Sequence, residues 1–412
     1  MQKNIFVLLF IFFLSPCIDA QTQGLDSYIQ KGLINSPLLL DYQNQIRLNQ
    51  IDSSVLLAQK KPQVNAIGQV LVAPAYNGYG YDEAVTNTGN YAAQVSVSQI
   101  IFAKKIYAPQ YEALRIENQS ISNTSKISEH DLKKSITDQY LTAYSSLAAL
   151  SFLKSTYELM QEEKVVLQKF VEQGLSKQTD YLSFEIAIQS EEIQMKQLQN
   201  QYRNDLRQLN LICGINDTAL YILTTPDIQV QTKIDNNNSL FLKQFKIDSI
   251  KINNQKSLAA ANYKPKLSWF ADAGLLGSNP SLLYKNFGGS FGLNFSVPLF
   301  DGRQKNLQYQ KITLYESTRS NYQKYYKSQH DLQFDQILSA ITENDQLIAQ
   351  IRKQLETTET LIKASKQLLN KGELSVTDFI ITIKNYIDIK GQLNTTELKK
   401  LQLTNELNYW NW

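Results

Sequence analysis

Residues 170–181 read FVEQGLSKQTDY, and residues 368–379 read LLNKGELSVTDF. Each stretch has a glycine, a Thr-Asp pair that begins five residues later and a final aromatic residue. The two glycines, Gly174 and Gly372, lie 198 positions apart in the chain. Because glycine readily adopts the left-handed conformation that ends many helices, each stretch predicts a tight reversal between two helices.

The segments before the two glycines are typical of very long helices. Residues 104–173 and 304–371 contain no glycine and, apart from Pro109, no proline. At 1.5 Å per residue, a helix of about 70 residues is about 105 Å long. Apolar residues at spacings of three and four favour coiled-coil packing. Shorter helices are expected to complete it over residues 24–60, 175–213, 240–262 and 373–410.

Earlier parts of the two halves of the chain also match each other in the same order. These further pairs are Lys61-Pro62 with Lys264-Pro265, and Ile101-Phe102 with Leu299-Phe300. Matches in one order at nearly one distance indicate an internal duplication. The sequence therefore predicts two tandem repeats of about 200 residues each.

Each half also contains two stretches in which apolar residues alternate with small or polar ones. In the clearest case Leu267, Trp269 and Ala271 alternate with Lys266 and Ser268. Runs of about ten residues with this pattern are typical of transmembrane β-strands. The alternative is an ordinary hairpin packed on a soluble core. The four predicted strands lie within residues 63–72, 91–98, 266–275 and 287–297.

Four strands do not close a barrel, because bacterial barrels have at least about eight. Unpaired N–H and C=O groups at an open sheet edge cannot face lipid, where each costs several kcal/mol. If the strands lie in a membrane, several copies of the chain must therefore contribute to one barrel.

The N-terminus is predicted to be a secretory signal peptide over residues 1–20. A short charged start is followed by the apolar run Ile5–Leu14, and Ala20 is a small residue at the expected cleavage site. The run is too short to span a membrane stably. The alternative is a lipid anchor at Cys17, although Pro16 directly before it fits a lipidation motif poorly.

The composition disfavours most other classes of protein. The 412 residues include 41 Lys and Arg against 38 Asp and Glu, a net charge of +3, so no basic surface for nucleic acid is expected. Two His and two Cys leave few ligands for a metal site. We expect no cofactor, no metal and no enzymatic activity.

The whole chain after residue 20 resembles the TolC family of outer-membrane efflux proteins. The resemblance depends on the order of several short motifs, because each alone is weak. They are the two Gly-x5-Asp turns at Gly174 and Gly372, the Lys-Pro before the first strand of each half, Val297-Pro298-Leu299-Phe300, and Leu209-Asn210 followed by Gly214.

This resemblance implies a mixed α/β membrane protein in the outer membrane of a Gram-negative bacterium, extending into the periplasm. It would be a homotrimer with a twelve-stranded β-barrel, four strands per chain, continued by an α-helical coiled-coil barrel. Residues 21–213 and 240–412 would be the repeats and 214–239 an equatorial linker. The alternative is a trimeric coiled-coil structural protein of the periplasm or cell surface that transports nothing.

Members of the resembled family are passive ducts of tripartite efflux or type I secretion systems. They receive substrate from an inner-membrane transporter through a periplasmic adaptor protein. The cargo and the class of pump stay open. The resemblance places the adaptor-contacting tips at Gly174, Leu175, Ser176, Gly372, Glu373, Leu374 and Ser375.

The resemblance also implies a periplasmic constriction at Asp180, Leu369, Asp378 and Ile381. The family's usual polar residues are replaced here by Leu369, Leu374 and Ile381, which favours an apolar gate. Asp180 and Asp378 have a second interpretation, as carboxylates at the starts of the returning helices. Leu175 and Leu374 are expected to be exposed docking contacts.

Overall fold

The computed structural model describes residues 22–74, 76–82, 89–102, 104–217, 219–231 and 239–411. The predicted signal peptide over 1–20 and its alternative, a lipid anchor at Cys17, lie outside these residues. Residues 232–238 of the predicted linker also lie outside them.

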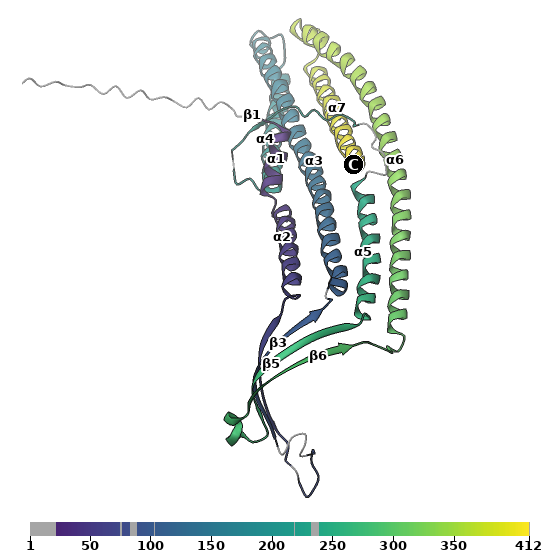
Figure 1. Cartoon of the computed structure of the whole chain (residues 1–412). Coiled ribbons are helices and arrows are strands. Elements are labelled where there is room, and N and C mark those ends of the chain that lie inside the picture. The colour runs from purple at the N-terminus through teal and green to yellow at the C-terminus, as the bar shows by residue number, and fades with distance from the viewer. Residues whose placement is uncertain are drawn as a thin grey trace, which may run out of the picture. The chain divides into compact units, whose positions relative to one another are not determined.

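The same order, a helical segment, two strands and two long helices, occurs twice along the chain, and two helices make up the first of these helical segments (Figure 1). The first series is α1 (Leu25–Asn35) and α2 (Pro37–Ala58), β2 (Gln63–Val72), β3 (Gly89–Ile101), α3 (Lys104–Glu172) and α4 (Gln178–Ile212). The second is α5 (Leu240–Asn262), β5 (Lys266–Gly277), the 3-10 helix η2 (Pro280–Lys285), β6 (Phe287–Ser296), α6 (Gln304–Asn370) and α7 (Val376–Trp410). The predicted long helices and strands all form.

The prediction of one continuous helix near the N-terminus is wrong, because the structure has two helices there. Residues 24–60 were expected to form a single helix, and the chain instead breaks between α1 and α2 at Ser36. The residue before a proline is disfavoured in the helical region, and Ser36, which precedes Pro37, has an extended conformation with ψ of 112°. The spacing of apolar residues continues through the break, so periodicity alone does not reveal it.

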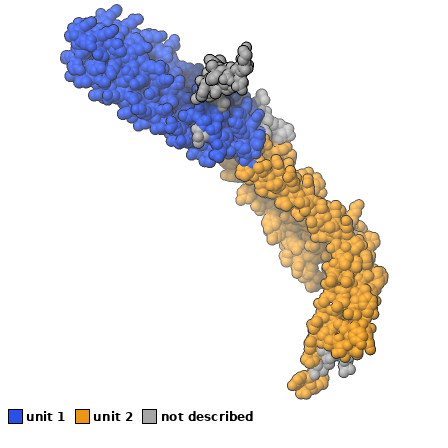
Figure 2. Space-filling model, turned by 90° about the vertical axis from the view of Figure 1, so that its left-hand side faces the viewer, with its two compact units in different colours: residues 1–36, 130–232, 333–411 blue, residues 37–129, 233–332, 412 orange. Residues whose placement is uncertain are grey.

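The described residues fall into two compact units (Figure 2). Unit 1 contains the described residues within 22–36, 130–231 and 333–411, and unit 2 those within 37–129 and 239–332. The long helices α3 and α6 contribute residues to both units.

Unit 2 contains a four-stranded antiparallel sheet in the order β2-β3-β5-β6. The register of the strands places most apolar side chains on one face of the sheet and most polar or small ones on the other. On one face Val64, Val97, Ala271 and Phe291 lie directly opposite one another across the four strands. The side chains of this apolar face are exposed to solvent in the single chain: Phe291 is 73% exposed and Phe295 66% exposed. The other face carries mostly polar or small residues.

The helices of unit 2 are joined by polar contacts. The Asn254 side chain of α5 donates to the Pro109 carbonyl of α3 at 2.9 Å. Asn123 of α3 donates to the Leu240 carbonyl at 3.0 Å. By contrast, α2 contains no buried residue. One side of this unit therefore has little apolar packing within a single chain.

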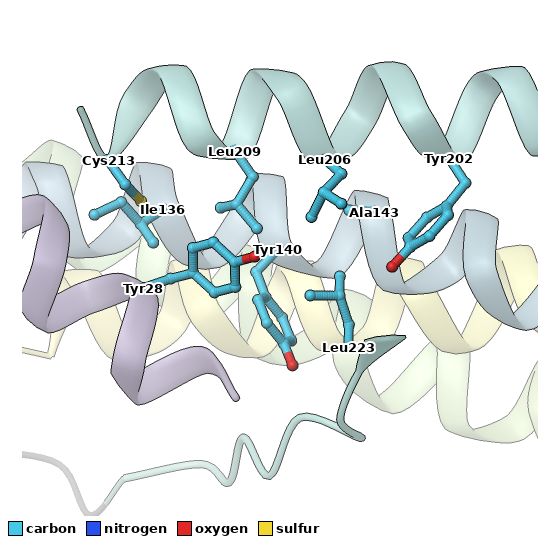
Figure 3. Close-up of a cluster of buried hydrophobic side chains, with 9 residues drawn as sticks. All are labelled: Tyr28, Ile136, Tyr140, Ala143, Tyr202, Leu206, Leu209, Cys213 and Leu223. Atoms are coloured by element: carbon cyan, nitrogen blue, oxygen red, sulfur yellow. The ribbon is translucent and has the colours of Figure 1, made fainter. Parts of the chain in front are cut away.

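Unit 1 has a core cluster where α1, α3 and α4 meet the segment that follows α4 (Figure 3). The Tyr140 hydroxyl of α3 donates to the Thr224 carbonyl at 2.7 Å, and the Tyr202 hydroxyl of α4 donates to the Tyr221 carbonyl. Two short strands, β1 (Thr22–Gln23) and β4 (Ile222–Leu223), pair in parallel beside this cluster. Residues 219–231 are thus held against the helices.

None of the described helices combines the length and the apolar character that a membrane-crossing helix needs.

Candidate docking site at the helical tips

The first reversal predicted from the sequence is a Schellman turn at the end of α3. Gly174 has a φ of 72°, and its N–H donates to the Val171 carbonyl at 3.0 Å. The next N–H, of Leu175, donates to the Phe170 carbonyl at 2.8 Å. These two bonds satisfy carbonyls that a helix end leaves without partners.

The second reversal, at the end of α6, has the same geometry. Gly372 has a φ of 74° and its N–H donates to the Leu369 carbonyl at 2.9 Å, while the Glu373 N–H donates to the Leu368 carbonyl at 2.9 Å. A Cβ at either tip glycine would meet no atom within 4 Å. The positive φ, rather than lack of space, therefore requires glycine at both tips.

Different side chains cap the two returning helices, Ser375 at α7 and Asp180 at α4. Ser375 Oγ accepts from the Asp378 N–H at 3.1 Å and donates to Asp378 Oδ2 at 2.6 Å. At the other tip Asp180 Oδ2 accepts from the Lys177 N–H at 3.4 Å. A carboxylate in the first turn also interacts favourably with the helix dipole. Asp180 therefore caps its helix directly, whereas Asp378 accepts a hydrogen bond from Ser375, the residue that caps α7.

An apolar cluster beneath the turns joins the two hairpins within unit 1. The rings of Phe184 on α4 and Phe379 on α7 stack with centroids 6.2 Å apart. All four helices contribute to the cluster, which consists of Met160, Leu167, Phe184, Ile188, Leu369, Val376, Phe379 and Ile383. The two tips therefore rest on one shared core.

Ion pairs reinforce this packing. Lys164 of α3 lies 2.8 Å from Glu185 of α4, and Lys366 of α6 lies 2.8 Å from Glu163 of α3. The hydrogen bond to Glu185 holds the pKa of Lys164 above its usual range. Within the described part of the chain, no group of three or more His, Cys, Asp or Glu side chains could hold a metal ion.

A cleft of about 540 Å³ separates the two turns. Predicted site residues from both hairpins line it, namely Gly174, Leu175, Ser176, Asp180, Leu369, Gly372, Glu373, Leu374 and Ser375. The other two predicted residues, Asp378 and Ile381, do not line this cleft. The structure therefore brings together residues that are almost 200 positions apart in the chain.

Neither family models nor curated protein sequences match the chain. Solved structures do match it over 94% of its length. The CmeC outer membrane channel of Campylobacter jejuni is 13% identical, with a TM-score of 0.73 over 85% of that chain. The outer membrane protein VceC of Vibrio cholerae is 13% identical, with a TM-score of 0.73 over 95% of that chain. The MtrE outer membrane channel of Neisseria gonorrhoeae is 11% identical, with a TM-score of 0.71 over 88% of that chain.

The chain has the fold of an outer-membrane channel. The resemblance to the TolC family that the sequence indicates is thus confirmed at the level of the fold.

Within this channel fold, the exposure of the tip residues separates the predicted leucines. Leu175 is 70% exposed, as expected of a docking contact. Leu374 differs from the expectation, because it is half-buried against the shared apolar cluster. Among the predicted constriction residues, Leu369 is only 4% exposed and belongs to the core of the chain, whereas Ile381 is 50% exposed.

Sequence reasoning missed several residues that line the cleft between the two turns: Leu167, Phe170, Lys177 and Val376. A signal for one of them was present. Phe170 lies at the position of a Schellman turn whose side chain commonly contacts the residue after the glycine, here Leu175. Lys177 carries no such signal, because an exposed lysine near a helix start is common on any surface.

Proposed function

We propose that three copies of the chain form a duct in the outer membrane of a Gram-negative bacterium. In this proposal the sheets form one twelve-stranded β-barrel and the helices form a tube that extends into the periplasm. Residues 21–213 and 240–412 are the two repeats of the unit, and 214–239 is its linker. The duct exports substrate passively and has no catalytic function.

The observation that carries this proposal is a sheet with open edges and a bare apolar face. In the described sheet β2 and β6 each pair with one neighbour only. Unpaired edge groups in lipid cost several kcal/mol each, so an isolated sheet of this kind is unstable in a bilayer. Pairing of β6 with β2 of the next copy satisfies both edges, and three copies give an even number of strands above the usual minimum.

The exposed side of α2 supports the same assembly. Leu48, Ile51 and Val55 follow one another at spacings of three and four and are all more than 45% exposed. Such a stripe is typical of a helix that packs on another helix. Because α2 buries no residue within its own chain, a helix of a neighbouring copy is the partner we propose.

We further propose that the tips meet a periplasmic adaptor protein that links the duct to an inner-membrane transporter of a tripartite efflux or type I secretion system. Exposed Leu175 and the cleft between the turns supply apolar contact area, and Glu373 and Lys177 supply charges at its border. Asp180, Asp378 and Ile381 would form the constriction of the assembled tube, with an apolar gate at Ile381, while Leu369 supports it from the buried cluster.

The first test is the mass and conductance of the detergent-extracted protein. Light scattering is expected to give a trimer, and negative-stain images a particle longer than about 100 Å, the length of a helix such as α3. The trimer is expected to conduct ions in planar lipid bilayers. A water-soluble monomer contradicts the assembly. A trimer that never conducts favours the structural coiled coil instead.

The adaptor is tested separately. Leu175→Asp places a charge in the exposed apolar contact and is expected to abolish co-purification with the adaptor of the source bacterium. The trimer mass and the bilayer conductance of the same variant serve as the control, since both are expected to stay unchanged. Unchanged co-purification would contradict the docking role of the tip.

A further inference from the structure

The polar face of the sheet carries one row that crosses all four strands. Asn65 of β2 lies opposite Ser96 of β3, Ser96 lies opposite Asp272 of β5, and Asp272 lies opposite Ser290 of β6. Ser290 Oγ donates to Asp272 Oδ2 at 2.8 Å. Each member of the row carries a side-chain oxygen, the type of ligand that hard cations prefer.

Asp272 is the only charged residue in the interior of the four strands. β2, β3 and β6 contain no Asp, Glu, Lys or Arg, and β5 contains only Asp272 and its first residue, Lys266. Lys266 shares the polar face but lies six residues away, about 20 Å along the strand. That exceeds two Debye lengths at physiological ionic strength, about 8 Å each, so the lysine does not neutralise the field at Asp272.

The neighbouring rows leave the carboxylate open on one side. Towards the loop that joins β5 and β6, the next row contains Ile67, Gln94, Gly274 and Gly288, and a Cβ at Gly288 would meet no atom within 4 Å. On the other side the Phe270 ring covers Gly292, whose Cβ would lie 2.6 Å from Phe270 Cζ. Asp272 is therefore open on the side of the two glycines and bordered by an aromatic residue on the other.

We propose that Asp272 determines charge selectivity inside the barrel, as a ring of three carboxylates that favours cations over anions. This inference rests on the proposed trimeric duct, because the row closes into a ring only when three sheets join. It concerns a position far along the chain from the tips, where the residues of the predicted constriction are partly apolar.

The size of the barrel makes three charges sufficient. Twelve strands spaced about 4.8 Å apart and tilted about 40° give a backbone radius of about 12 Å. The carboxylates project inward from this wall, so most of the cross-section lies within about one Debye length, about 8 Å, of a negative charge. Rings of acidic side chains favour cations in other pores for the same electrostatic reason. Cationic substrates are accordingly expected to pass this level more easily than anionic ones.

Reversal potentials in planar bilayers with a KCl gradient test the proposal. Asp272→Asn is expected to lower the ratio of K⁺ to Cl⁻ permeability by about twofold or more, and the difference from the unmodified protein is expected to vanish near 1 M salt, where the Debye length is about 3 Å. Asn294→Ala, two rows away on the same face, keeps the row of Asp272 intact and is expected to leave the ratio close to that of the unmodified protein.

Variants that move the carboxylate to another position of the same row distinguish an effect on charge selectivity from an effect on folding. Asn65→Asp adds three carboxylates to the same ring and is expected to raise the permeability ratio, whereas the double variant Asn65→Asp with Asp272→Asn is expected to restore it. A conducting trimer whose ratio does not respond to these changes overturns the inference and leaves the duct intact. Absence of conductance in the unmodified protein overturns the proposed function itself.

Discussion

The ammonium of Lys366 on α6 lies 2.8 Å from Glu163 Oε1 on α3, and Glu163 is only 2% exposed. This pair joins the two helical hairpins next to their shared apolar core. The lysine also lies 3.6 Å from Glu162, which is 72% exposed. The ammonium of Lys366 therefore pairs with one buried and one solvent-exposed carboxylate, and the two ion pairs are expected to contribute differently to stability.

Removal of the lysine is predicted to be costly because it leaves the Glu163 carboxylate buried without its partner. Lys366→Met is expected to destabilise the hairpins by about 2 kcal/mol, less than for a fully buried pair because Lys366 itself is partly exposed. Glu162→Gln is the matched control and is expected to cost less than about 0.5 kcal/mol. Thermal unfolding of the solubilised protein measures both. Equal midpoints for the two variants would contradict the prediction.

The pair also has a defined pH dependence. The hydrogen bond to Glu163 raises the pKa of Lys366 above its usual range. A lysine whose folded pKa is raised stabilises the fold fully below its unfolded pKa, about 10.4, and this contribution is lost as pH rises through the folded pKa. The difference in unfolding midpoint between Lys366→Met and the unmodified protein is therefore expected to shrink above about pH 10.4.

The lengths of the helices and the faces of the strands could be predicted because each depends on local chemistry. Glycine at positions 174 and 372 predicts where the helices reverse, and the alternation of apolar and polar residues along 266–275 predicts which side chains share a face of the sheet. Contacts between the hairpins could not be predicted. The spacing places Glu163 on the face of Met160 and Leu167, but nothing in it indicates that the partner of this buried carboxylate is Lys366 of α6. The half-buried state of Leu374 likewise depends on a cluster to which all four helices contribute.

Cys213 is predicted to be unreactive in the folded protein. Its side chain is fully buried in the core cluster of unit 1, and burial raises the pKa of its thiol to about 11. At pH 8 the thiolate fraction is then about 0.001, roughly two hundredfold below that of an ordinary cysteine. With residues 1–20 removed it is the only thiol of the chain.

Labelling with a maleimide at pH 8 is therefore expected to be at least about a hundredfold slower in the native protein than in denaturant. The native rate is expected to rise with pH towards pH 11. Rapid native labelling at pH 8 would show that the cluster around Cys213 opens readily.

Glu191 on α4 is predicted to make stability depend on pH in the acidic range. Burial raises the pKa of its carboxyl, the nearby Lys384 of α7 lowers it, and Asp388 of α7 raises it. A carboxyl with a raised folded pKa contributes stability that is fully present below its unfolded pKa, about 4.3, and lost as pH rises through the folded pKa. Glu191→Gln removes this dependence.

At pH 7 the glutamine variant is expected to be more stable by about 1 kcal/mol, since it buries no charge. The gain is expected to disappear below about pH 4.3, where Glu191 is protonated in both states. Unfolding midpoints measured across this range check the sign. Glu192→Gln, at a half-exposed position with an ion pair to Lys196, is the control and is expected to show no such gain.

The tip glycines are predicted to be irreplaceable for a reason of backbone conformation alone. A Cβ at Gly174, Gly372 or Gly391 would meet no atom within 4 Å, and of these three glycines Gly174 and Gly372 have positive φ. Gly174→Ala and Gly372→Ala are each expected to destabilise the hairpin by about 1–2 kcal/mol, the cost of a left-handed alanine. Gly391→Ala, inside α7, is expected to stabilise by up to about 1 kcal/mol, because alanine favours helix. Thermal unfolding and limited proteolysis at the tips distinguish the two effects, and shifts of the same sign at all three positions would contradict the geometric explanation.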